Sequence, residues 1–185
     1  MSQSHGDWSA PSWIAAIWGV GGVVALLGQA IWRLTPLAAE PIEQGLLTNP
    51  QWALYVGWVA INLYAEGYRA FHRGFSPRVV VRAVHLASQP ETIRVLFAPA
   101  FCMSLFHATR RGLALAWGVL ITVVSLVVLM HWVPQPWRGI IDGGVVVGLL
   151  WGALSVLWYF GRALSGHLPR VPSNLPENAT VPQGS

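Results

Sequence analysis

The chain contains no lysine, a single cysteine and few charged residues of either sign. All 11 basic residues are arginines, and charged residues make up 10% of the 185 residues, against roughly 25% in a typical soluble domain. The lone Cys102 excludes an intrachain disulfide and a cysteine-cluster metal site. With 54% hydrophobic residues, the chain has too few polar groups to cover a soluble surface. The composition therefore indicates an integral membrane protein.

No motif in the sequence assigns a reaction. There is no phosphate-binding P-loop, no G-x-G-x-x-G after a strand, no G-x-S-x-G nucleophile elbow and no histidine pair at metal-binding spacing. The net charge of +4 does not predict nucleic-acid binding, because the arginines flank apolar runs as topology determinants do. We therefore predict no catalytic residue, no metal site and no cofactor, and an enzyme is the less favoured class.

Apolar runs near the ~20 residues that a membrane helix needs predict an all-α bundle of four transmembrane helices. Residues 33–50 hold three prolines and two glutamates, so we expect an external loop there. The membrane domain is expected over residues 13–164, after an N-terminal cytoplasmic tail at 1–12 and before a proline-rich, disordered tail at 165–185. The expected spans are residues 13–32, 51–68, 112–132 and 139–160.

The segment 77–109 is harder to place. Ser88 to Glu91 fits a capping box, which predicts that a helix starts there. Its continuous apolar run, 95–108, is short for a span and contains Pro99, which is more usual for a half-inserted or interfacial helix. A short fifth span is the alternative.

The distribution of arginines separates these alternatives. If the segment returns to its own side, nine arginines are cytoplasmic and two are external, whereas a crossing segment gives a split of six to five. The positive-inside rule therefore favours four spans in a bacterial inner membrane, with both termini cytoplasmic. The nine are Arg69, Arg73, Arg78, Arg82, Arg94, Arg110, Arg111, Arg162 and Arg170.

A short amphipathic helix is expected on the cytoplasmic side. Ser76 followed by Pro77 is a strong helix start. From there Arg78, Arg82 and His85 recur at spacings of four and three, which makes one basic face. We expect this face at the level of the lipid headgroups, where arginines attract anionic lipids. Alternatively, the helix merely covers the cytoplasmic end of the bundle.

Few polar residues are expected at membrane depth. Glu66 lies near the cytoplasmic end of the second expected span, at helical spacing from Arg69 and Arg73. An interfacial ion pair is the preferred interpretation, and a proton or cation site is the sharper alternative.

Two further polar residues lie in the expected spans. Asp142 is placed near the external face beside Arg138, again as an ion pair, and therefore at the opposite face from Glu66. Asn62 is the deepest strongly polar group in its span and is expected to hydrogen-bond a neighbouring helix.

Two other groups of residues complete the candidates. His72, His85 and His107 all fall near the expected cytoplasmic face and are weak candidates for binding a cofactor such as haem. Consecutive small-xxx-small steps in the last span let two helix backbones approach closely, within the chain or in a dimer. These steps are Gly144, Gly148 and Gly152.

Three function classes remain open. The first is a non-catalytic accessory, assembly or scaffold subunit, whose partners are anionic membrane lipids and either a second copy or a larger membrane protein. The second is a transporter or channel component that uses Glu66, Asn62 or Asp142. The third is a cofactor-binding or headgroup-modifying enzyme that uses cytoplasmic histidines and arginines. The near absence of polar groups at mid-membrane depth favours the first class, because a pore needs a polar lining.

Overall fold

The computed structural model describes residues 10–172, and every regular element in that part of the chain is a helix. Three helical stretches are long and apolar enough to cross a membrane, which indicates a membrane protein. Most of the two expected tails, 1–12 and 165–185, lies outside the described residues. The three stretches are Trp13–Glu43, Arg110–Met130 and Trp137–Leu164.

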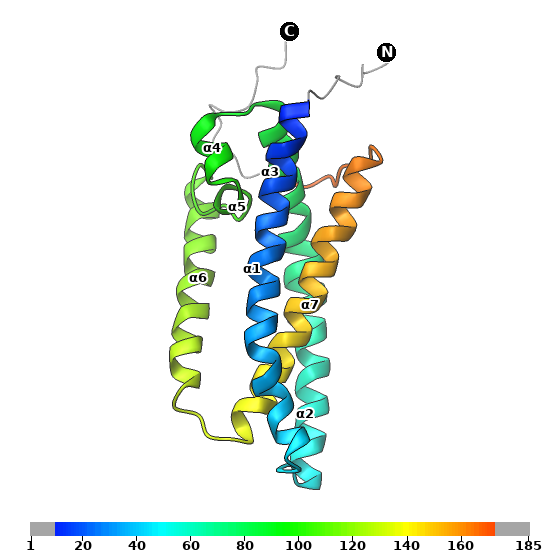
Figure 1. Ribbon diagram of the computed structural model, residues 1–185, viewed down its shortest axis with the longest axis vertical. Coiled ribbons are helices and arrows are strands. Elements are labelled where there is room, and N and C mark those ends of the chain that lie inside the picture. The colour runs from blue at the N-terminus through cyan, green and yellow to red at the C-terminus, as the bar shows by residue number, and fades with distance from the viewer. Residues whose placement is uncertain (1–9, 173–185) are drawn as a thin grey trace.

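The long helices run up and down the long axis of the molecule (Figure 1). The first descends, three consecutive elements return together, and α6 and α7 form the second descending and ascending pair. The two short helices α4 and α5 lie at the end where α3 stops and α6 starts. The elements are α1 (Ala10–Glu43), α2 (Asn49–Asn62), η1 (Leu63–Phe75), α3 (Ser76–Ser88), α4 (Thr92–Leu96), α5 (Ala98–Cys102), α6 (Arg110–Met130) and α7 (Trp137–Leu164).

Helix α1 continues well beyond the first expected span. The expected loop at 33–50 is wrong for residues 33–43, which are helical despite Pro36 and Pro41. A proline removes one backbone hydrogen bond, and packing against a neighbouring helix can offset that loss. The ring of Pro41 packs directly over Gly139 of α7, where there is no side chain in the way. Tertiary packing therefore overrides the local proline signal.

The returning segment is one continuous helix whose middle is a π-helix. The backbone stays helical at Asn62 and Ser76, where α2, η1 and α3 join. The helix therefore does not end at Tyr68, the expected limit of the second span, and no loop precedes Ser76. In a π-helix the hydrogen bonds run from i to i+5, so each turn holds more residues than an α-helical turn. This change of period alters which side chains share a face.

Residues 92–102, which were expected to form a half-inserted helix, form two short helices. Helix α4 begins at Thr92, and Glu91 before it makes no capping hydrogen bond, so the predicted capping box at Ser88 to Glu91 is wrong. Helix α5 packs against α1, where Pro99 lies directly over Gly22. A β-carbon at Gly19 would lie 2.8 Å from the Sγ atom of Cys102.

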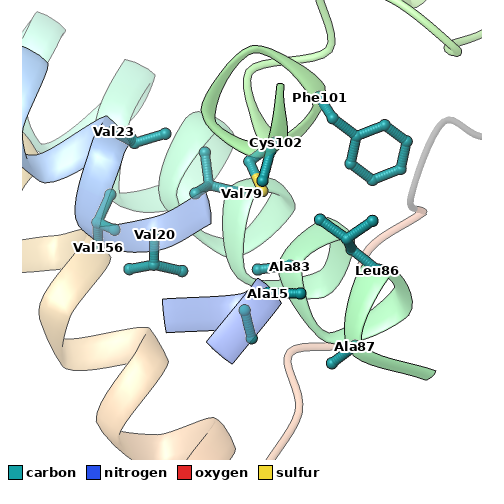
Figure 2. Close-up of a cluster of buried hydrophobic side chains, with 12 residues drawn as sticks. Ala15, Val20, Val23, Val79, Ala83, Leu86, Ala87, Phe101, Cys102 and Val156 are labelled. Atoms are coloured by element: carbon teal, nitrogen blue, oxygen red, sulfur yellow. The ribbon is translucent and has the colours of Figure 1, made fainter. Parts of the chain in front are cut away.

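The main hydrophobic core lies at this end of the bundle, between α1, α3, α5 and one residue of α7 (Figure 2). Close packing of these apolar side chains holds α5 against α1 and α3. Its labelled members are Ala15, Val20, Val23, Val79, Ala83, Leu86, Ala87, Phe101, Cys102 and Val156.

Helix α6 stands apart from the other long helices (Figure 1). Its most apolar window of 18 residues has no buried residue, whereas half of the corresponding window of α7 is buried. Helix α1 packs against α7, α3 and α5, but α6 has no comparable packing partner among the described residues. The fold therefore consists of a tight α1–α2–η1–α3–α7 bundle and a separate apolar helix.

Candidate functional site

The side chains of α2 and η1 pack on a row of glycines in α7, and we call this contact the η1–α7 seam. A β-carbon at Gly144 would lie 2.7 Å from the Nδ2 atom of Asn62, and one at Gly148 would lie 3.0 Å from Oε2 of Glu66. The ring of Phe71 covers Gly152 in the same way, 2.6 Å from the added carbon. The glycine row is therefore occupied within the chain.

Glu66 is half-buried in this seam without a partner. No hydrogen bond or ion pair of its carboxylate forms within residues 10–172, so the predicted pairing with Arg69 and Arg73 is wrong. Both arginines are exposed. The π-helix accounts for the difference, because residues three and seven positions on no longer stack over the same face. Glu66 instead lies against Gly148, near the middle of α7.

Of the other two polar candidates, Asn62 differs from expectation, whereas Asp142 forms the predicted ion pair with Arg138. Asn62 is buried, but its Nδ2 donates to the Trp58 carbonyl 2.9 Å away on its own helix and not to a neighbouring one. Asp142 lies 3.6 Å from the Nε atom of Arg138. It precedes Gly148 by six residues (148 − 142), which is about 9 Å along a helix. Glu66 and Asp142 are therefore not placed at opposite ends of the bundle.

His72 adds a further polar contact to the η1–α7 seam. Its Nδ1 atom lies 3.0 Å from the Oγ atom of Ser155 in α7. The imidazole packs between two tyrosine rings, with centroid distances of 5.7 Å to Tyr68 and 5.1 Å to Tyr159. An imidazole held by a hydroxyl and two aromatic faces has a defined orientation.

The three candidate histidines lie on different elements. His85 is half-buried in α3, whereas His107 is exposed in the turn before α6. No three His, Cys, Asp or Glu side chains group as a metal site in the part of the chain that the structure describes. The structure therefore does not bring His72, His85 and His107 together.

Arg82 is the most unexpected residue of the fold. It is fully buried, so the prediction that it faces lipid headgroups is wrong. Its Nε donates to the Phe101 carbonyl at 2.7 Å, and one terminal nitrogen donates to the carbonyls of Phe106 and His107 at 3.2 and 3.1 Å. The guanidinium lies 4.2 Å above the Phe101 ring. In the basic face of α3, Arg82 is therefore covered by α5 and the turn after it, and its hydrogen bonds hold that turn.

Arg94 is a second buried arginine at this end of the bundle, where only a cytoplasmic location was expected of it. Its guanidinium lies 3.1 Å from Glu91 and 5.9 Å from the Phe101 ring, so two arginines flank one phenylalanine. Burial lowers the pKa of His85, and the nearby Arg94 and Arg82 lower it further. Arginine side chains are mostly exposed in proteins, so the sequence around Arg94 predicts an exposed side chain.

No protein-family model, curated protein or solved structure matches this chain. The function therefore has to be argued from the chemistry and packing of its own residues.

Proposed function

We propose that the protein is a non-catalytic accessory or scaffold subunit that binds a transmembrane helix of a partner membrane protein along α6. The unpartnered α6 is the observation that carries this proposal. Its 21 residues contain no charge between Gly112 and Met130, and none of its apolar window is buried. Because α6 makes few contacts with the other helices, most of its length is available to pack against another helix.

Small residues support a helix as the partner. A β-carbon added at Gly118 of α6, or at Gly21 and Gly28 of α1, would meet nothing within 4 Å. Glycines at open positions let a second backbone approach closely, and such contacts drive helix association in membranes. The glycine row Gly144, Gly148 and Gly152 of α7 is already covered by α2 and η1, whereas the glycines named above in α6 and α1 lie at open positions.

We also propose a topology with four spans in a bacterial inner membrane and both termini cytoplasmic. The fourth span is α2 with η1, which form one continuous helix beside α7. The start of α6 at the end where α3 stops supports a segment that returns to its own side (Figure 1). The nine-to-two arginine split then places α3, α4 and α5 on the cytoplasmic side.

Two cysteine variants test this topology. His107 and His131 are exposed and lie at opposite ends of α6. In a Cys102→Ser background, we expect His131→Cys to react with an impermeant thiol reagent on intact cells. His107→Cys should react only after lysis. The opposite labelling pattern would contradict the proposed topology.

The partner proposal is tested by photo-crosslinking in cells. A photoreactive amino acid at Val119 or Val123 of α6 should give crosslinks of protein size, because both side chains are at least half exposed. The same probe at Leu154 of α7, which is 55% exposed, is the matched control and should give mainly lipid adducts. A partner captured from α6 should also co-purify in mild detergent at a fixed stoichiometry. A crosslink at twice the mass of the chain would make the partner a second copy.

Transfer of protons or cations through the membrane is the second candidate, and the unpaired carboxylate of Glu66 favours it. If α6 crosslinks only lipid and the protein purifies as a monomer, the scaffold proposal fails. A change in ion leak of proteoliposomes on Glu66→Gln would then support the second candidate. For a scaffold we expect this substitution to leave the leak unchanged, because Glu66 is packed against a helix and not exposed to a pore.

A further inference from the structure

A basic pocket lies where η1, α3 and the first turn of α6 meet. Its volume is about 380 Å³. Arg73, Arg78 and Arg111 line it from three different elements, and no carboxylate of residues 10–172 lines it. The remaining lining residues are Gly74, Thr109, Gly112, Leu115, Val171 and Pro172. Three guanidinium groups around one cavity repel each other, and an anion bound between them would offset this repulsion.

One of the three arginines is fixed in place. The Nε atom of Arg78 donates to the Gly74 carbonyl at 2.6 Å, which leaves its terminal nitrogens for another acceptor. A β-carbon at Gly74 would lie only 3.2 Å from a terminal nitrogen of Arg78, so the glycine gives the guanidinium room. Within residues 10–172, neither Arg73 nor Arg111 forms an ion pair.

The start of α6 adds to the positive potential of the pocket. The Oγ1 atom of Thr109 accepts a hydrogen bond from the backbone N–H of Gly112 at 3.2 Å, which caps the helix. The N–H groups of Arg110 and Arg111 are in the first turn and have no acceptor within the helix. The positive end of a 21-residue helix dipole therefore points toward the cavity that Arg111 lines.

The depth of the pocket selects the kind of anion. The uncharged part of α6 begins at Gly112, so the pocket lies at the boundary between headgroups and hydrocarbon. Leu115, which is 55% exposed, continues the wall of the pocket into the apolar side of α6. We propose that the pocket binds the phosphate group of an anionic phospholipid, whose acyl chains follow α6. Basic pockets between helices at this depth suit such headgroups.

Lipid retention by the purified protein tests this site. Native mass spectrometry in detergent should show that the wild type retains phosphatidylglycerol in preference to phosphatidylcholine. The triple variant Arg73→Gln, Arg78→Gln, Arg111→Gln should bind phosphatidylglycerol at least roughly tenfold more weakly, because each arginine contributes attraction. The matched control Arg69→Gln, Arg110→Gln, Arg162→Gln removes the same charge from exposed positions that do not line the pocket. It should keep wild-type affinity.

Each result decides the proposal. Equal losses in the two triple variants would mean general surface attraction, and no loss in the pocket variant would mean that the site is elsewhere; both overturn it. Inorganic phosphate and glycerol phosphate are titrated as soluble competitors. If they bind as tightly as the lipid, the ligand is a free phosphate compound and the lipid assignment fails. The single variant Arg111→Gln, which leaves the Arg78 hydrogen bond intact, repeats the test if the triple variant is unstable.

Discussion

Substitution of Arg82 with alanine is expected to release α5 and the turn after it from the bundle. The guanidinium donates hydrogen bonds to three backbone carbonyls and covers the Phe101 ring. Burial lowers its pKa to about 10, which leaves it protonated at neutral pH. Without it, the buried carbonyl of Phe101 and the partly buried carbonyls of Phe106 and His107 lose this donor. We expect the free energy of unfolding of this end of the molecule to fall by about 3 kcal/mol.

Cys102 reports this change directly. It is the only cysteine, it is the last residue of α5, and it is only 1% exposed. Its reaction with a thiol reagent therefore requires local opening of α5, and about 3 kcal/mol corresponds to roughly a hundredfold faster labelling. Arg82→Lys should give an intermediate rate, because one ammonium cannot reproduce the planar fork of a guanidinium.

The exposed Arg69 in η1 provides the control for Arg82. Arg69→Ala removes the same charge without removing a buried hydrogen bond, so Cys102 should stay as protected as in the wild type. Equal labelling rates in Arg82→Ala and Arg69→Ala would mean that Arg82 does not hold the segment. The lysine variant keeps the comparison available if the alanine variant does not fold.

Continuous apolar runs allowed α6 and α7 to be located from the sequence. The uncharged stretch from Gly112 and the proline turn before Trp137 mark these helices by hydropathy and backbone chemistry alone. Both signals are local, so no knowledge of neighbouring helices is needed. The three glycines of α7 could likewise be recognised as a close-packing surface.

Features that depend on neighbouring helices could not be derived in this way. Pro36 and Pro41 indicate a loop by their backbone chemistry, yet α1 runs through them where Pro41 packs on Gly139. A basic stripe on α3 predicts a surface that faces lipid headgroups, because the sequence does not show that α5 covers Arg82. Amphipathicity shows that one face differs from the other, but a buried guanidinium among carbonyls produces the same pattern as an exposed one.

The environment of Glu66 could not be predicted for a different reason, which is the period of the helix. Arg69 and Arg73 follow Glu66 by three and seven residues, and they share its face only if the helix has 3.6 residues per turn. The 13 residues of η1 follow a wider period, which directs Glu66 toward α7 and leaves both arginines exposed. A π-helix has no simple sequence signature, so this part of the candidate site could be found only from the structure.

The second large effect is expected when Gly22 of α1 is replaced, whereas the adjacent Gly21 should tolerate the same change. Pro99 packs directly on Gly22, where an added β-carbon would overlap the proline ring, whereas one at Gly21 meets nothing within 4 Å. The ring is rigid, and α5 is only five residues long, so a methyl group at position 22 must displace α5. We expect Gly22→Ala to destabilise the protein by about 1–3 kcal/mol through overpacking.

Gly21→Ala is the matched control for this effect. Both substitutions gain the same helix propensity from replacing glycine in a helix interior, so their difference isolates the contact with Pro99. Gly21→Ala should keep Cys102 protected and leave stability unchanged or slightly higher, measured by unfolding in a denaturing detergent. Gly22→Ala should label Cys102 faster and unfold earlier. If the two variants behave alike, α5 is not docked on α1 through Gly22, and it would have to be held by the hydrophobic core and Arg82.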